Sequence, residues 1–308
     1  MNLFDFHCDT PFELYKKGIQ LTENDLHISL DKARCFSHYG QVMAIWTEHS
    51  LDAEAAWCQF HAIREDFLAK IPPEQATLCL DRADYQKAKE AGRSPLFLAV
   101  EGAFLLNGDL ARLDELYRCG VRFLTLVWRG SDIIGGAFDT EDPLTPFGRE
   151  VVARCFELGI TVDVSHASDA VVGECLAMAR AAGKSVIATH SNSRAVFSHP
   201  RNLSDAHAVA IAESGGVVGI SMAPQHLDSG GEASVESVCR HIRHYCDIGI
   251  GDALVFGCDF DGIAGTPRGI ENITHLYKIA ETLSEKGFSD AEIEGLFWRN
   301  AEKYLTRL

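Results

Sequence analysis

The feature that most constrains this chain is a regular alternation of short apolar segments with longer amphipathic ones. Runs rich in β-branched and aromatic residues predict strands, and the amphipathic stretches after them predict helices. We expect eight strands, at residues 3–7, 41–47, 96–101, 123–128, 161–166, 185–190, 216–222 and 254–259. The clearest helices are expected at 52–71, 110–119, 146–158, 168–182, 204–214 and 235–248. Such alternation indicates parallel strands joined by right-handed crossovers.

Eight strand–helix units in 308 residues predict an α/β fold, a single (β/α)8 TIM barrel. The alternative is a doubly wound open sheet, which uses the same alternation. It is disfavoured because no glycine-rich phosphate-binding turn follows the first expected strand. We find no linker-like segment, so we expect one domain over residues 1–308. Within it, residues 271–308 are expected to form C-terminal extra helices.

The charge balance excludes several classes of partner. The chain has 28 Lys+Arg against 44 Asp+Glu, a formal net charge of −16, which argues against nucleic acid and anionic membranes. No run approaches ~18 uninterrupted apolar residues, so we expect no membrane span. The ten cysteines contain no C-x-x-C pair and no leader peptide is evident, which predicts a cytoplasmic protein with reduced thiols. The sequence leaves open whether the chain forms a homodimer.

Polar side chains stand at the ends of five expected strands. They are His7, Asp9, Glu101, His166, His190 and Asp259. In a (β/α)8 barrel the carboxyl ends of the strands meet at one mouth, where catalysis takes place. Because side chains alternate along a strand, His7 and Asp9 share a face while Cys8 and Cys258 point outward and are rejected as ligands. A carboxylate closing an apolar strand, as Glu101 does, is costly unless it is paired or metal-bound.

This donor set predicts a metal centre. Histidines and carboxylates without thiolates suit Zn²⁺, with Mn²⁺, Co²⁺ or Fe²⁺ as alternatives. Five ligands exceed what one catalytic zinc needs, so we expect two Zn²⁺ ions. The expected ligands are His7 and Asp9 on one ion, His166 and His190 on the other, and Glu101 as the bridge. Two such ions hold a hydroxide at neutral pH, and Asp259 would carry its proton to the leaving group.

For two further residues, Asp261 and His226, a role in the site is left open by the sequence. Asp261 shares the face of Asp259, so spacing alone does not exclude it. His226 belongs to a second His-x-Asp sequence in the loop after the seventh expected strand. The Gly/Ser-rich stretch at 228–231 favours a solvated loop there over a ligand.

The motifs resemble the amidohydrolase superfamily and, more narrowly, the membrane (renal) dipeptidase family, metallopeptidase family M19. The matching segments are 6–10, 100–102, 124–126, 163–166, 189–191, 201–203 and 257–262. The resemblance implies a dizinc barrel enzyme that hydrolyses dipeptides, often with a D-residue at the C-terminal position. It assigns Asp259 as acid/base, the five residues above as ligands, and Arg201 as the group that grips the substrate carboxylate. Arg suits that role because its planar fork matches a carboxylate.

One departure from the family concerns the oxyanion. Where the family typically places a histidine that stabilises the tetrahedral intermediate, this chain has Trp128. The indole N–H could donate a hydrogen bond, Arg129 could take over, or Trp128 could form an aromatic wall of the substrate pocket. The departure leaves two alternative functions: hydrolysis of another small amide or lactone, and an inactive metal-binding barrel. The retained Asp259 disfavours the inactive barrel.

Overall fold

The eight predicted strands form a parallel, nearly closed barrel. The computed structural model describes residues 1–229 and 232–307, so part of the loop expected at 228–231, and residue 308, lie outside the described residues. The described strands are β1 (Leu3–Cys8), β2 (Tyr39–Trp46), β3 (Ala76–Leu78), β4 (Ser94–Glu101), β5 (Val121–Thr125), β6 (Thr161–Asp163), β7 (Val186–Ile187), β8 (Val218–Ile220) and β9 (Leu254–Phe256). Eight of them follow the order β7-β6-β5-β4-β2-β1-β9-β8, and a parallel bridge between Ala188 and Val218 links β7 to β8. The (β/α)8 prediction is confirmed.

Two details differ from the prediction. Strand β3 was not expected, because three residues are too few to show a periodicity; it pairs only with β4, off the barrel path. Strands β6, β7 and β8 are two or three residues long, shorter than expected. His166 and His190 lie three residues beyond the ends of β6 and β7, on irregular backbone.

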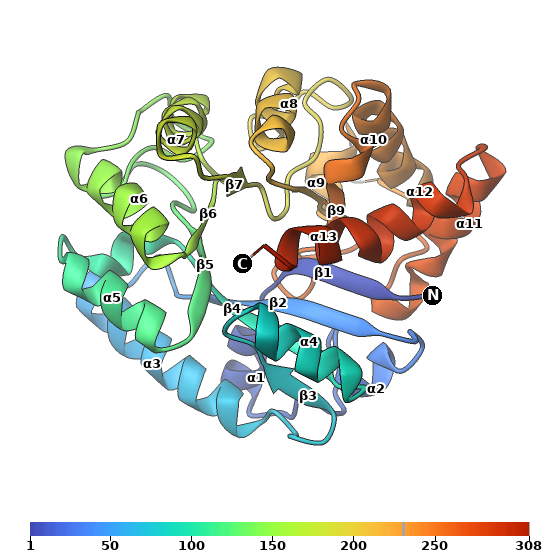
Figure 1. Cartoon of the computed structure of the whole chain (residues 1–308), viewed down its shortest axis with the longest axis horizontal. Coiled ribbons are helices and arrows are strands. Elements are labelled where there is room, and N and C mark those ends of the chain that lie inside the picture. The colour runs from blue at the N-terminus through green and yellow to red at the C-terminus, as the bar shows by residue number, and fades with distance from the viewer. Residues whose placement is uncertain (230–231, 308) are drawn as a thin grey trace.

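Helices surround the barrel (Figure 1). They are α1 (Thr10–Lys17), α2 (Leu30–Ala33), α3 (Ala53–Ala69), α4 (Arg82–Glu90), α5 (Leu110–Arg118), α6 (Pro146–Leu158), α7 (Asp169–Ala182), α8 (Asp205–Glu213), α9 (Pro224–Leu227), α10 (Val235–Asp247), α11 (Tyr277–Glu285), α12 (Asp290–Glu294) and α13 (Asn300–Leu305). Short 3₁₀ segments occupy Ala103–Leu106, Gly251–Ala253 and Ile273–His275, and a π-helical segment occupies Gly295–Arg299. Helix α7 begins and ends as its sequence predicts: the Ser168 hydroxyl accepts from the Val171 N–H, and Gly183 stops the helix in a left-handed conformation. Among the described helices, none combines the length and apolarity that a membrane crossing requires.

The strands bury two layers of side chains. Along β4, Phe97 and Ala99 face the barrel interior, where Phe97 packs against Phe123 with ring centroids 6.0 Å apart. The alternate residues Leu98 and Val100 belong to a separate layer between strands and helices. Glu101 continues the inward series two residues after Ala99, and therefore points into the barrel at its carboxyl end.

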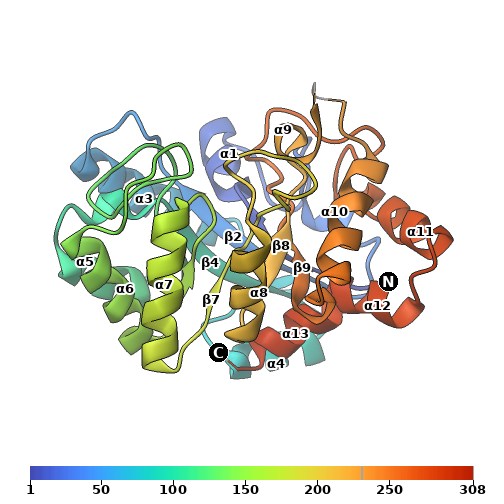
Figure 2. The same cartoon turned by 90° about the horizontal axis from the view of Figure 1, so that it is seen from above.

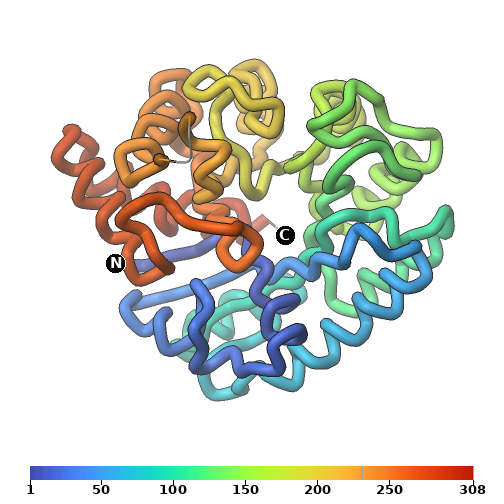
Figure 3. Tube along the Cα trace, turned by 180° about the vertical axis from the view of Figure 1, so that it is seen from behind, coloured from blue at the N-terminus to red at the C-terminus, as the bar shows by residue number. Residues whose placement is uncertain are grey.

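Helices α4 and α13 cover one end of the barrel (Figure 2). Trp298 and Tyr304 pack into the inner cluster, and the Tyr304 hydroxyl lies 3.1 Å from Thr161 Oγ1. The residues expected to form extra helices thus fill the amino-terminal end of the barrel. Figure 3 shows the opposite end, where α1 and the segment after β9 lie. The polar strand ends face that side.

Candidate metal centre

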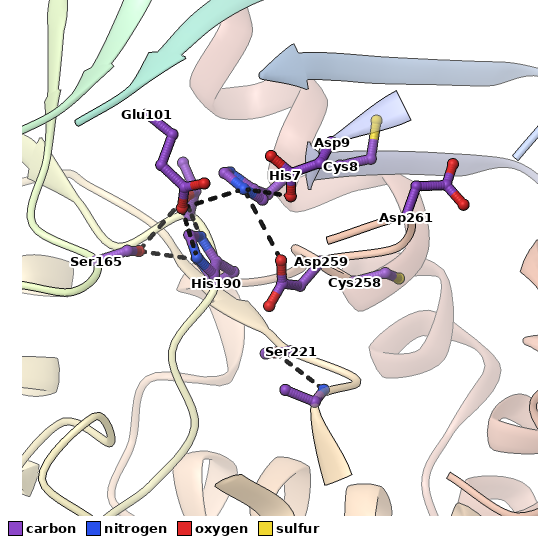
Figure 4. A network of polar contacts seen from close by, with 12 residues as sticks. His7, Cys8, Asp9, Glu101, Ser165, His190, Ser221, Cys258, Asp259 and Asp261 are labelled. Atoms are coloured by element: carbon purple, nitrogen blue, oxygen red, sulfur yellow. Dashed lines mark hydrogen bonds and ion pairs between the residues drawn. The ribbon is translucent and has the colours of Figure 1, made fainter. Parts of the chain in front are cut away.

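Six predicted site residues converge at the carboxyl end of the barrel. Their positions follow the strands: His7 in β1 and Asp9 just after it, Glu101 at the end of β4, and His166, His190 and Asp259 after β6, β7 and β9. In Figure 4 the side chains of His7, Asp9, Glu101, His190 and Asp259 point toward one another, whereas those of Cys8 and Cys258 point away. The cysteine side chains thus lie where the sequence predicts.

An irregularity in β1 brings His7 into the site. The pairing of β1 with β2 shifts register between Asp5 and Cys8. Phe6 therefore packs in the barrel interior, while Cys8 Sγ lies outside it, 3.4 Å from Met43 Sδ. Strict alternation, with His7 facing inward, would place Phe6 outside the barrel. The sequence pattern therefore predicts the direction of His7 correctly but does not reveal the bulge.

Glu101 stands at the centre of the cluster. Its Oε1 lies 3.5 Å from His7 Nε2, 3.1 Å from His166 Nε2 and 3.4 Å from His190 Nε2. The two latter nitrogens are 3.0 Å apart. On the other side, His7 Nε2 lies 3.6 Å from Asp9 Oδ2 and 4.0 Å from Asp259 Oδ1. Glu101 thus faces three imidazoles, as a bridging carboxylate would.

Several buried polar atoms of the cluster lack hydrogen-bond partners within the described residues. His166 Nδ1 lies 3.0 Å from the Trp128 carbonyl, which can only accept, so His166 presents a lone pair at Nε2. In the part of the chain that the structure describes, buried Glu101 Oε1, Asp9 Oδ1 and His7 Nε2 have no hydrogen-bond partner. Buried polar atoms without partners are costly, and a bound cation would satisfy both the carboxylate oxygens and the imidazole lone pairs. The residues therefore fit divalent metal ions. Three overlapping groups at the site have donor atoms close enough to share an ion: Glu101, His166 and His190; His7, Asp9 and Asp259; and His7, Asp163 and His190.

The electrostatics agree with this reading. Burial raises the pKa of Glu101, and burial together with Glu101 raises the pKa of Asp9 to about 7. Burial also raises the pKa of Asp259 well above its ordinary range. Burial lowers the pKa of His7, but the carboxylates of Glu101, Asp9 and Asp259 outweigh it and raise that pKa to about 10. The raised carboxyl pKa values mean that the ionised carboxylates are costly in this buried space without a positive partner, which a bound cation would supply.

Backbone strain is concentrated at the same place. His166, Asp259 and Asp261 adopt φ values of 67°, 62° and 68°, and Asn107 is the other non-glycine residue with positive φ in the described chain. Each such conformation costs ~1–3 kcal/mol and is typical of functional sites. Asp259 thus owes its position to a backbone that most L-residues avoid.

The structure separates Asp261 from the cluster. Its Oδ2 accepts a hydrogen bond from Thr10 Oγ1 at 2.6 Å, and its Oδ1 accepts one from the His27 N–H at 2.7 Å. In Figure 4 its side chain points away from Glu101. Both oxygens are engaged by protein donors, so Asp261 holds the β1 and β9 loops together and Asp259 is the free carboxylate.

A pocket of about 360 Å³ opens beside the cluster. Its walls include Phe12, Trp46, Trp128, Phe138 and His226, and its base includes Asp9, Glu101, His166 and Asp259. Trp128 packs on Trp46 and His49, each with ring centroids 5.4 Å apart. The expectation of a solvated loop at His226 is wrong, because His226 lies in α9, is partly buried and lines the pocket.

Arg201 is buried rather than exposed. Only 4% of it is accessible, and its Nη1 donates to Ser191 Oγ at 3.0 Å. Its Nε has no hydrogen-bond partner among residues 1–229 and 232–307. Burial lowers the pKa of Arg201, while the charges of Asp259 and Glu101 act in the opposite direction. A buried guanidinium with an unpaired N–H beside the cluster is suited to bind an anionic group.

The fold and the site define a metal-dependent hydrolase built on a TIM barrel. A sequence model of the family "Membrane dipeptidase (Peptidase family M19)" matches residues 1–307. The chain therefore belongs to this family, as its motifs indicate, and it is a metallo-dipeptidase.

Individual relatives agree with this assignment. A Klebsiella pneumoniae protein named for its position in the pqqA 5′ region is 31% identical over 235 residues, covering 72% of this chain and 85% of the relative. The crystal structure of dipeptidase AC, a family M19 metallopeptidase, has a TM-score of 0.91 at 27% identity, covering 100% of this chain and 98% of that chain. A Rhodobacter sphaeroides metallopeptidase, liganded with a phosphinate mimic of the dipeptide L-Ala-D-Ala, has a TM-score of 0.91 at 26% identity, covering 100% and 99%.

Proposed function

We propose that the chain is a binuclear zinc dipeptidase that accepts L,D-dipeptides. The observation that carries the proposal is the convergence of three imidazole nitrogens on the buried Glu101 Oε1, each within 3.5 Å. The residues that would hold the two ions are His7, Asp9, Glu101, His166 and His190. When bound, two divalent cations lower the pKa of a shared water and polarise the scissile carbonyl.

Asp259 would be the acid/base of the reaction. It lies beside the cluster, 4.0 Å from His7 Nε2, and lines the pocket. Among the described residues, none donates to its carboxylate as Thr10 and His27 donate to Asp261. Burial raises its pKa, which favours a carboxyl that takes up a proton from the attacking water and returns it to the leaving amine.

Arg201 would bind the C-terminal carboxylate of the substrate. Its unpaired Nε and its burial support this assignment, since a charge-assisted bond to a carboxylate would satisfy the guanidinium. The Rhodobacter sphaeroides relative was solved with a mimic of an L,D-dipeptide, which supports the same stereochemistry here. Trp128 would serve as an aromatic wall, because its ring packs on Trp46 and His49 at the edge of the pocket.

The test is metal analysis combined with a panel of L,L- and L,D-dipeptides, on wild type and Glu101→Ala. We expect about two zinc ions per wild-type chain and fewer in the variant. Wild-type protein that binds no metal after supplementation would overturn the centre. A loaded enzyme that cleaves only L,L-dipeptides would overturn the proposed stereochemistry.

Arg201→Ala separates dipeptides from other amide substrates. We expect KM to rise for dipeptides with a free carboxylate and to change little for the same dipeptides with a C-terminal amide. Equal losses on both would contradict the assignment of Arg201 and favour an amide hydrolase of different specificity.

A further inference from the structure

A buried chain of hydrogen bonds lies behind His190. Thr189 Oγ1 stands 2.8 Å from His190 Nδ1 and 2.6 Å from Asp163 Oδ2. Asp163 itself has 0% exposure, and its position inside the barrel at the end of β6 places it beneath the metal cluster. Neither Asp163 nor Thr189 has a part in the reaction described above.

The donors around Asp163 fix the direction of these hydrogen bonds. Its Oδ2 accepts from the hydroxyls of Thr125 and Thr189, each at 2.6 Å. Its Oδ1 accepts from the N–H groups of Ser165 and Thr189, each at 2.9 Å. Four donors saturate the carboxylate, and the hydroxyl proton of Thr189 is therefore committed to Asp163.

Thr189 can then only accept from His190. With its single proton on Asp163, the lone pairs of Thr189 Oγ1 face His190 Nδ1, so the imidazole proton must lie on Nδ1. His190 Nε2 is left with a lone pair directed at Glu101 Oε1 and His166 Nε2, 3.4 Å and 3.0 Å away. The neutral tautomer with the proton on Nε2 could not bind a cation there.

We propose that Asp163 and Thr189 are positioning residues that set the tautomer of His190 and so create the second metal site. The inference rests on the proposed ligand role of His190. The hydrogen-bond chain Asp163–Thr189–His190, here called the relay, resembles the carboxylate–histidine–metal arrangement with one hydroxyl inserted. In that arrangement an outer carboxylate orients the ligand and raises its basicity. His166 obtains the same tautomer differently, because its Nδ1 faces the Trp128 carbonyl at 3.0 Å.

Thr189→Val is the main test, since it removes the hydroxyl and nearly keeps the shape. Zinc-loaded full-length protein is titrated with a chelator of known affinity. We expect one of the two ions to bind about 10–100-fold more weakly in Thr189→Val, while Thr189→Ser, which keeps the hydroxyl, retains wild-type affinity. Thr125→Val is the matched control: it removes a hydrogen bond of the same 2.6 Å length to the same Asp163 oxygen, but it does not touch His190.

A second readout reports the tautomer itself. Protein labelled with ¹⁵N in its histidine rings is compared by NMR before and after the chelator has removed the ions, with His190 assigned from a His190→Gln variant. We expect the proton on Nδ1 in wild type and Thr125→Val, and on Nε2 in chelated Thr189→Val, where Glu101 Oε1 can accept it. Thermal unfolding checks that each variant is folded.

The outcomes distinguish the relay from the metal centre. Suppose that wild type binds two ions. The proposed relay is then wrong, and the metal centre stands, if Thr189→Val binds both ions as tightly as wild type or if Thr125→Val loses as much affinity as Thr189→Val. If wild type binds no zinc, the proposed function fails. In that case the NMR measurement still tests the relay, because a proton on Nε2 of His190 in wild-type protein would refute it.

Discussion

Gly262 is the position where adding a single methyl group should damage the site most. A Cβ at this residue would overlap Asp9 Oδ2 and would stand 2.8 Å from Asp259 Oδ1. Both atoms belong to the metal cluster, and both side chains are held by a strained or buried backbone. Gly262→Ala therefore cannot be accommodated by moving a flexible surface group.

The magnitude follows from the distances. Restoring an ordinary contact of 3.4 Å moves Asp259 Oδ1 by about 0.6 Å, and Asp9 must move further. Functional groups need to be placed within about 0.5 Å, and misplacement on the order of 1 Å costs about 10²-fold in rate. We expect Gly262→Ala to lower kcat/KM by about 100-fold, which corresponds to about 2.7 kcal/mol of transition-state stabilisation.

The assay is dipeptide hydrolysis together with metal content, measured on Gly262→Ala and on Gly265→Ala. Gly265 lies three residues further along the same loop, and a Cβ there meets nothing within 4 Å. It controls for the general effect of stiffening the loop. Unchanged kcat/KM and unchanged metal content in Gly262→Ala would refute the reasoning, as would equal losses in the two variants.

Three further changes test separate parts of the argument. Asp259→Asn should lower kcat by ~10²–10⁴-fold while both metals stay bound, whereas Asp261→Asn should mainly lower thermal stability; equal losses of kcat would contradict the assignment. Trp128→Phe should change kcat by less than tenfold if Trp128 is an aromatic wall of the pocket, as proposed. A loss of ~10²–10³-fold would instead indicate that its indole N–H stabilises the oxyanion. Burial lowers the pKa of His241 in the folded protein to about 4, so between about pH 6.5 and pH 4 the unfolded chain binds more protons than the folded one. The free energy of unfolding should therefore fall by about 3 kcal/mol as the pH is lowered through this range. Urea unfolding of wild type against His241→Gln should show a smaller acid loss in the variant.

Much of the fold and of the metal site can be predicted from the sequence, because both depend on the two-residue alternation of side chains along each strand. Alternation along β4 carries Glu101 inward after Phe97 and Ala99, and strand ends of a barrel must meet. The same logic misses irregular backbone. The bulge before Cys8 and the left-handed conformations of His166 and Asp259 depend on tertiary contacts that no local pattern encodes.

Asp163 shows a signal that was present in the sequence. Like Glu101, it is a carboxylate within an apolar strand, between Val162 and Val164, and such a group needs partners. Spacing alone did not reveal that those partners are threonine hydroxyls. Arg201 is the opposite case, because a charged residue beside a proline looks exposed in the sequence and only the packing of the β7–α8 loop buries it.

The closure of one barrel end by α4 and α13 has a kinetic consequence. Within the described part of the chain, we therefore expect substrate and both product amino acids to pass through the pocket at the opposite end, which Trp128 and His226 help to line. If Arg201 binds the C-terminal carboxylate as proposed, the amino acid that it holds after cleavage must leave before the next dipeptide binds. We therefore expect accumulated free amino acid to compete with the dipeptide and to slow its hydrolysis.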